Sequence, residues 1–426
     1  MTPRRPPEWP QPRAWQALRW ILRPEAWMLA SRERFGDVFV LHLPFGPQVF
    51  LADPEAIKDV FTGDPAVFHA GEGNAPLEPA VGAHSILLLD DEPHVRQRRL
   101  LLPPFRGSRL GRWTATMAEI ARADVDRWPA GEPFALEARM RAITLEVILR
   151  VVFGIEQDAR LAELRALLRR LMPRGGAQVV AMLPAFRRDL GPGSPWRTFL
   201  ATRARIDAIL FDEIARRRAD PGLAGREDVL SMLAATDMTD AEMRDELMTL
   251  LLAGHETTAV SLAWTFALLF AHPDAHARAI AGARAGETAF LDAVVAEALR
   301  LRPPIPAVVR RLTAPATVAG YDLPAGTKVS PAIWLVNRRE DLYPQPHAFR
   351  PERFLENAPQ TYTWLPFGGG IRRCVGASFA TTEMRVVLGE VLARADLRAA
   401  DPPPRRSTRR AIVLGPPRGT RAILTR

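Results

Sequence analysis

Residues 366–376 read Pro-Phe-Gly-Gly-Gly-Ile-Arg-Arg-Cys-Val-Gly, and Cys374 in this stretch is the only cysteine of the 426-residue chain. The glycines allow backbone N–H groups and a flat ligand to approach the sulfur closely. We expect a helix to begin after the cysteine, where the helix dipole and the neighbouring arginines bring the thiolate within reach at neutral pH. A lone cysteine is more often an inert core residue. The glycine-rich, arginine-rich loop instead favours a thiolate metal ligand.

Written as Phe-x-x-Gly-x-Arg-x-Cys-x-Gly, residues 367–376 resemble the heme-ligand loop of the cytochrome P450 family at every specified position. The resemblance implies that Cys374 is the thiolate ligand of the iron of heme b, a ligand that favours O–O cleavage. It also implies that Phe367 packs beside the sulfur and that Arg372 binds a heme propionate, as a planar and permanently charged donor can.

The composition is that of a globular protein, with 47% hydrophobic and 25% charged residues. Length alone predicts two or three domains, whereas the resemblance implies an N-terminal arm over residues 1–29 and one heme domain over 30–426. One cysteine forms no internal disulfide, and residues 1–23 contain no uninterrupted apolar segment typical of a signal peptide or membrane anchor. We therefore expect a soluble, monomeric, cytoplasmic protein of bacterial type.

The chain carries 57 Lys and Arg against 48 Asp and Glu, and only Lys58 and Lys328 are lysines. The arginines are scattered through helical patterns and form no aromatic-interleaved tract, which argues against nucleic-acid binding. Several arginines fall in segments that the resemblance places on the cysteine side of the heme, where they could dock an acidic electron carrier. An ordinary solvated basic surface is the alternative. These arginines are Arg96, Arg99, Arg106, Arg109, Arg112 and Arg373.

The hydrophobic pattern predicts a mainly α protein with small β-sheets. Residues 37–43 and 48–52 flank a Pro-Phe-Gly-Pro turn and predict a hairpin. Residues 92–300 are mostly helical in pattern, with apolar positions at three- and four-residue spacing. Short strands are expected at 317–335 and 411–425.

Residues 247–271 form a long apolar stretch with His255 and Glu256 at its centre. A membrane helix rarely places such residues at its centre, so the pattern indicates a long core helix of a soluble domain. Thr239 and Glu242 form a capping box before it, and Pro273 ends it.

Residues 253–258 of that helix, Ala-Gly-His-Glu-Thr-Thr, resemble the family's oxygen-activation motif. Ala253 and Thr257 are four residues apart and share a face, which the resemblance places over the heme. Thr257 would hold dioxygen and a water by hydrogen bonds, and Glu256 would relay protons. A threonine that bonds its own helix backbone is the alternative for Thr257. Gly254 costs about 1 kcal/mol in a helix, which indicates the close approach of something flat.

Two further sets of charged residues resemble family elements. The first is Glu297-x-x-Arg300 together with Arg353, which would form a buried structural network behind the ligand loop. The second set would bind the heme propionates: His94 and Arg98, which share one side of a predicted helix turn, and Arg310.

The substrate pocket can be outlined only by position. The apolar residues expected around it are Ile86, Leu87, Leu88, Ala253, Ala307, Val308, Val309 and Leu414. Residues 175–195, rich in glycine and proline, resemble a mobile lid over the channel. The mainly apolar walls favour a hydrophobic substrate, although the same residues could be ordinary core.

The resemblance implies a heme-thiolate monooxygenase that hydroxylates or epoxidises a hydrophobic molecule such as a fatty acid or terpenoid. No flavin or iron–sulfur domain fits the remaining length, so electrons would come from a separate ferredoxin or flavodoxin and an NAD(P)H-dependent reductase. A peroxide-dependent peroxygenase on the same fold is one alternative, and the Glu256-Thr257 pair argues against it. A heme-binding sensor without catalysis is another.

Overall fold

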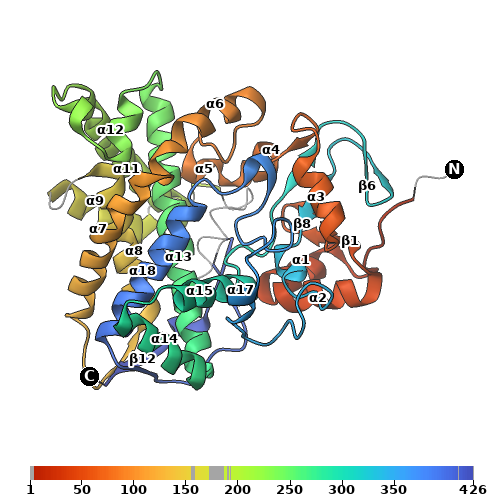
Figure 1. Ribbon diagram of the computed structural model, residues 1–426. Helices are drawn as coiled ribbons and strands as arrows, with labels where there is room; N and C mark the ends of the chain where they lie inside the picture. The colour runs from red at the N-terminus through yellow and green to blue at the C-terminus, as the bar shows by residue number, and fades with distance from the viewer. Residues whose placement is uncertain are drawn as a thin grey trace.

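The computed structural model describes residues 4–154, 159–171, 187–189, 191, 193–410 and 412–425. Figure 1 shows a large group of helices on one side of the molecule and, on the other, a smaller part with the main β-sheet and the N-terminal helices. The predicted class, mainly α with small sheets, is confirmed. The longer helices of the described chain are α1 (Arg13–Leu22), α2 (Pro24–Phe35), α3 (Pro54–Thr62), α6 (Asp91–Leu101), α7 (Ser108–Val125), α8 (Leu136–Phe153), α9 (Ala159–Leu171), α11 (Pro195–Arg218), α13 (Asp240–Ala271), α14 (Pro273–Ala285), α15 (Ala289–Leu301) and α18 (Ala377–Arg394).

The main sheet has the strand order β1-β2-β8-β5-β3. The predicted hairpin is its first pair, with Phe39 opposite Phe50 and the two rings stacked at 5.8 Å. Part of the segment expected as strand, 317–335, instead forms the short helix α16 (Ile333–Val336). The strands of this sheet are β1 (Val38–Leu43), β2 (Gly46–Leu51), β3 (Phe68–His69), β5 (Arg310–Leu312) and β8 (Lys328–Pro331).

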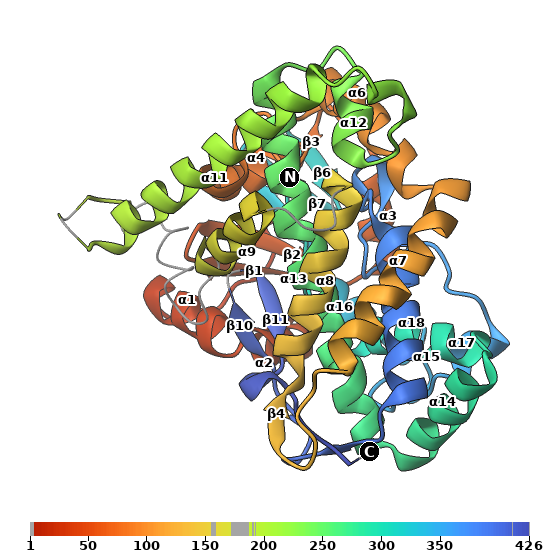
Figure 2. The ribbon, with the colours of Figure 1, turned by 90° about the vertical axis from the view of Figure 1, so that its left-hand side faces the viewer.

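In the described part of the chain, three smaller sheets lie outside the main one. The first pairs β6 (Ala316–Val318) with β7 (Tyr321–Leu323), and the second has the order β4-β12-β9. The third is the C-terminal hairpin, β10 (Thr408–Arg410) and β11 (Val413–Gly415), which Figure 2 shows beside α13. The members of the second sheet are β4 (Pro133–Ala135), β9 (Leu397–Ala399) and β12 (Arg421–Leu424).

The N-terminal region contains two helices that the sequence analysis did not predict. Trp20 of α1 and Trp27 of α2 are buried in one apolar cluster with Phe39 and Phe50. The boundary expected between residues 29 and 30 falls inside α2. The division into an arm and a heme domain stays a prediction.

Helix α13 is the long central helix that the pattern predicts. Its N-terminus carries the expected capping box: the Thr239 hydroxyl accepts from the Glu242 amide, and the Glu242 carboxylate accepts from the Thr239 amide. Most of its residues are buried against other helices. Within the described ranges, no helix is long and apolar enough to cross a membrane.

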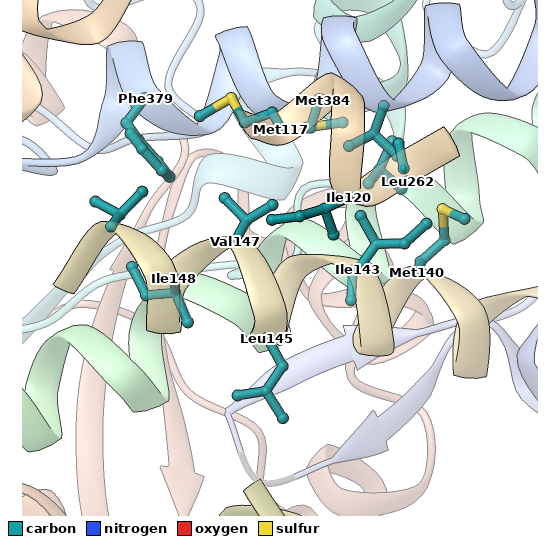
Figure 3. Close-up of a cluster of buried hydrophobic side chains, with 14 of the residues drawn as sticks. Met117, Ile120, Met140, Ile143, Leu145, Val147, Ile148, Leu262, Phe379 and Met384 are labelled. Carbon is teal, nitrogen blue, oxygen red and sulfur yellow. The ribbon is translucent and has the colours of Figure 1, made fainter. Parts of the chain in front are cut away.

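Helix α8 packs along α13, and it also contacts α7. Figure 3 shows Met140, Ile143 and Val147 of α8 directed toward Ile120 and its neighbours, with Met384 of α18 close by. Because these side chains recur at helical spacing, they occupy one face of α8. From the adjoining face, Arg141, Thr144 and Ile148 contact α13.

Candidate heme site

A cavity of about 890 Å³ lies between the Cys374 loop and α13. Cys374 and Phe367 line one wall, while Ala253 and Thr257 line another. Such a cavity, enclosed mainly by apolar side chains with a few convergent polar groups, is the usual form of a ligand site. Its wall also includes Ile86, Leu87, His94, Arg98, Glu256, Ala307, Val308, Val309, Arg310 and Arg372.

The ligand loop owes its path to two glycines that lie against α3. A β-carbon on Gly369 would come within 2.4 Å of the Phe61 ring, and one on Gly370 within 1.9 Å of the Phe61 carbonyl oxygen. Gly370 also has a φ of +64°, a conformation that glycine adopts most readily. The Cys374 amide donates to the Phe367 carbonyl at 3.0 Å, which closes the loop.

The exposed surface of Cys374 faces the cavity, which lies within the protein. Burial raises the pKa of its thiol, although the Gly376 amide, Arg373 and Arg98 act in the opposite direction. The expectation that the loop alone brings the thiolate within reach at neutral pH is therefore wrong. The cost of desolvating the thiolate exceeds its stabilisation by the helix N-terminus and the arginines. A coordinated metal ion would itself deprotonate the thiol.

Basic side chains converge at one end of the cavity in a way that fits the heme propionates. His94 is buried, and burial together with Arg372 and Arg98 lowers its pKa to about 3. Burial and Arg372 lower the pKa of Arg310 to about 10. Among the residues that the structure describes, His94, Arg98 and Arg310 have no ion pair with a carboxylate. Two propionates would supply the missing negative charge.

Arg372 is the exception, because it already has an acidic partner. It forms an ion pair with Asp90 and donates to the Ile86 carbonyl at 3.0 Å. Asp90 is held in turn by the amides of residues 70–72 at 2.9–3.0 Å. Asp90, which the sequence analysis missed, therefore orients Arg372 at the edge of the cavity.

Thr257 lines the cavity with its hydroxyl donating to the Ala253 carbonyl at 2.8 Å. This is the backbone bond that was weighed as the alternative. The hydroxyl oxygen keeps its acceptor capacity for a group in the cavity.

Gly254 lines the cavity and also lies against a neighbouring helix. A β-carbon there would lie 3.0 Å from Ile148 Cδ1 of α8. The glycine therefore makes room for α8, a contact that was not predicted. The close approach of a flat group on the cavity side stays a prediction.

Glu256 is buried, and its carboxylate lies 2.5 Å from Nη2 of Arg141. Burial raises the pKa of this carboxyl, and Arg141 opposes the shift. Arg141 was not predicted from the sequence, since 115 residues separate the pair and no local spacing relates them.

The structure brings Glu297, Arg300 and Arg353 together in one network. Both Glu297 oxygens accept from Arg300, at 2.7 and 2.8 Å, and one also accepts from Arg353 at 3.1 Å. Glu297 and Arg300 are fully buried. Arg300 further donates to the backbone carbonyls of residues 337, 346 and 348. The network thereby ties α15 to the segment that leads into the ligand loop.

Two of the expected pocket residues lie outside the cavity wall. Leu414 is buried, with its carbonyl accepting from the Trp264 indole at 3.1 Å. Side chains alternate along a strand, and Val413 is the neighbour that lines the cavity. Leu88 is likewise absent from the wall, and its carbonyl lies against Gly71.

The arginines expected to dock an electron carrier do not behave alike. Arg96 pairs with Asp237 and Glu242, and Arg112 pairs with Glu227. Within the described part of the chain, the members without an acidic partner are Arg99, Arg106, Arg109 and Arg373. Residues 175–186, 190 and 192 of the expected lid lie outside the described residues.

The fold and this site define a class: a helical protein with a single cysteine facing a long helix across a cavity, in the arrangement of a heme-thiolate enzyme. Among the described residues, no cluster of three or more His, Cys, Asp or Glu side chains could hold a metal ion. A single thiolate suits a metal that brings its other ligands with it, as heme iron does.

Comparison with known proteins identifies the family. The cytochrome P450 family model matches residues 5–421. Cytochrome P450 135B1 of Mycobacterium tuberculosis is 45% identical over 92% of this chain and 86% of its own length. Cytochrome P450 137 of the same species is 39% identical over 98% and 90%. The chain belongs to the cytochrome P450 family and is a P450 monooxygenase.

Solved structures agree on the fold. CYP175A1 from Thermus thermophilus has a TM-score of 0.76 and 28% identity, with 99% of this chain and all of that chain covered. Cyanobacterial CYP120A1, solved with retinoic acid bound, has a TM-score of 0.85 and 24% identity, with 99% of both chains covered.

Proposed function

We propose that this protein binds heme b through Cys374 and transfers one atom of dioxygen to a hydrophobic small molecule, by hydroxylation or epoxidation. The observation that carries the proposal is that Cys374 and the Ala253–Thr257 face of α13 line the same cavity. The apolar part of the wall, including Ile86, Leu87 and Val308, favours an apolar substrate such as a fatty acid or terpenoid.

The residues around the cavity have different roles. When bound, the thiolate-ligated heme supplies the oxygen-activating chemistry. His94, Arg98, Arg310 and Arg372 hold its carboxylates and so fix its orientation. The Thr257 hydroxyl, which donates to the Ala253 carbonyl, would orient a water in the cavity by accepting a hydrogen bond from it. It would donate to dioxygen only after releasing that carbonyl.

Glu256 supplies protons to that face of the cavity. Its raised pKa supports this role, because a proton donor works best when its pKa approaches the operating pH.

Electrons would come from a separate acidic ferredoxin or flavodoxin, reduced through an NAD(P)H-dependent reductase. Arg99, Arg106 and Arg373 are exposed and would form part of the docking surface. Opposite charges at such a surface accelerate encounter, and salt weakens the effect. A monomeric protein in the reducing cytoplasm would suit such a partner.

The test uses the purified heme protein. Fatty acids, terpenoids and steroids are screened for a shift of the heme absorption caused by displacement of bound water. The best ligand is then incubated with NADPH, ferredoxin and reductase. An oxygenated product that depends on ferredoxin supports the proposal. Product from peroxide alone favours the peroxygenase, and NADPH consumption without any oxygenated product favours the sensor.

A further inference from the structure

Glu256 belongs to a chain of alternating charges that extends away from the cavity. Arg141, which lies 2.5 Å from Glu256, also donates from Nε to Glu137 at 3.0 Å. Glu137 is buried and forms a second ion pair, with Arg410. The order Glu256–Arg141–Glu137–Arg410 thus joins α13, α8 and β10.

The position of Arg141 allows it to pair with two carboxylates. Thr144, one turn along α8, donates to the His255 carbonyl at 3.0 Å, and Ile148 lies against Gly254. The spacing of three and four residues puts these side chains and Arg141 on one face of α8. Arg141 therefore reaches Glu256 because two further contacts fix the register of the helices.

Arg410 connects this chain to the substrate side of the cavity. Arg410, Ile412 and Val413 of the C-terminal hairpin all line the wall. Arg410 also donates to the Pro416 carbonyl at 3.1 Å, which holds it to its own hairpin. A molecule that displaces the hairpin would move Arg410 relative to Glu137.

We propose that Arg141 is a positioning residue for Glu256 and that Glu137 and Arg410 set how firmly Arg141 holds it. Glu137 and Glu256 compete for one guanidinium. When Arg410 neutralises Glu137, Arg141 pairs with Glu256. When Arg410 moves away, Arg141 pairs more strongly with Glu137, and Glu256 takes up a proton more readily. The hairpin, which lines the cavity, would thus control the proton donor. This inference rests on the proposed role of Glu256.

The charged groups that act on Glu256 have opposite effects, which makes the proposal testable. Arg141 and Arg410 lower its pKa, whereas Glu137 and burial raise it. Arg141→Gln and Arg410→Gln should therefore move the protonation of Glu256 to higher pH, and Glu137→Gln should move it to lower pH. A loss of structure without a charge effect would not give shifts of opposite sign.

Protonation is measured by infrared difference spectroscopy of the ferric heme protein across a pH series. Subtracting the series of Glu256→Gln isolates the band of this carboxyl. Arg141→Lys keeps the charge and should shift the band less than Arg141→Gln. Arg139→Gln is the matched control, because it removes a guanidinium of α8 that pairs with Asp124 at 2.8 Å instead, and it should leave the band unchanged.

The outcomes separate the two proposals. Shifts in the order predicted support the charge chain even if the protein proves inactive with ferredoxin, because the measurement involves no turnover. Equal shifts of one sign, or a shift in Arg139→Gln as large as in Arg141→Gln, overturn it. If Arg141→Gln does not fold, the opposite signs of Arg410→Gln and Glu137→Gln still decide. In the active protein, the pH profile of product formed per NADPH should shift in the same order.

Discussion

Ile148 of α8 lies against Gly254 of α13, so closely that a β-carbon on the glycine would come within 3.0 Å of Ile148 Cδ1. This approach accompanies the Thr144 hydrogen bond to the His255 carbonyl. Gly254 therefore serves the packing of two helices. The same packing places Arg141 beside Glu256.

Gly254→Ala should therefore change the thermal midpoint differently in two backgrounds. In the wild-type chain, the gain of about 1 kcal/mol in helix propensity is offset by the clash with Ile148, so the thermal midpoint should not rise. In Ile148→Ala, where the clash is absent, the same change should raise the midpoint. Thermal unfolding of the four proteins in this double-mutant cycle checks the coupling. Equal effects in both backgrounds would contradict the contact.

Cys374→Ser should remove the thiolate ligand without disturbing the fold. The reduced protein with carbon monoxide should lose the absorption band typical of thiolate ligation, because serine oxygen is a poor substitute for the sulfur. The far-ultraviolet circular dichroism should stay unchanged. A variant that keeps the thiolate-type band would show that another group binds the iron.

Glu297→Ala should prevent stable folding around the heme loop. The change leaves Arg300 fully buried without a counter-charge, and breaking a buried pair in this way costs about 3–5 kcal/mol. Equilibrium unfolding and the heme content of the purified protein measure the loss. Glu352→Ala is the control, because its 3.0 Å pair with Arg278 is exposed and contributes at most about 1 kcal/mol.

His255 should make the protein less stable in acid. Burial lowers its pKa from 6.5 to about 4, so the folded protein leaves it neutral over that interval while the unfolded chain binds a proton. Stability therefore falls as the pH drops through this window, by about 3 kcal/mol in all. His255→Gln lacks this contribution.

The unfolding free energy of His255→Gln relative to wild type should rise by about 3 kcal/mol between neutral pH and about pH 4. Urea unfolding of both proteins across this range gives the difference. A constant difference would mean that His255 keeps its ordinary pKa.

Arg106→Glu and Arg99→Glu should weaken the use of an acidic ferredoxin. Each reversal should raise the ferredoxin concentration needed for half-maximal reduction and reduce its salt dependence, because the steering charge is reversed. Arg13→Glu on α1 provides a control with the same change in net charge. Equal effects of all three would indicate a general charge effect and no defined docking surface.

Much of the fold was predictable because its signals are local. The first hairpin, α13 with its capping box and the charge network of Glu297 each depend on residues close in sequence or on a short motif. The N-terminal helices were missed because Trp20 and Trp27 are buried by contact with β1 and β2, which composition does not report.

The identities of the site residues were predictable, whereas their contacts were less so. Cys374, Thr257 and the basic residues were identified because their motifs resemble those of the cytochrome P450 family. Leu414 and Leu88 were misplaced, because the direction of one side chain in a strand or loop depends on its hydrogen-bond partners. The thiol of Cys374 was expected to ionise readily, but only three-dimensional burial reveals the desolvation that opposes it.

The sequence by itself identified the residues proposed to ligate the iron, orient oxygen and form the buried charge network, because each lies in a short motif that resembles one of the cytochrome P450 family and supplies a particular chemical group. Only the tertiary structure decided that Gly254 receives Ile148, that Asp90 holds Arg372, and that Arg141 and Arg410 stand behind Glu256. These relationships join residues more than 100 positions apart. The distances and desolvation that control their energies exist only after the helices have packed.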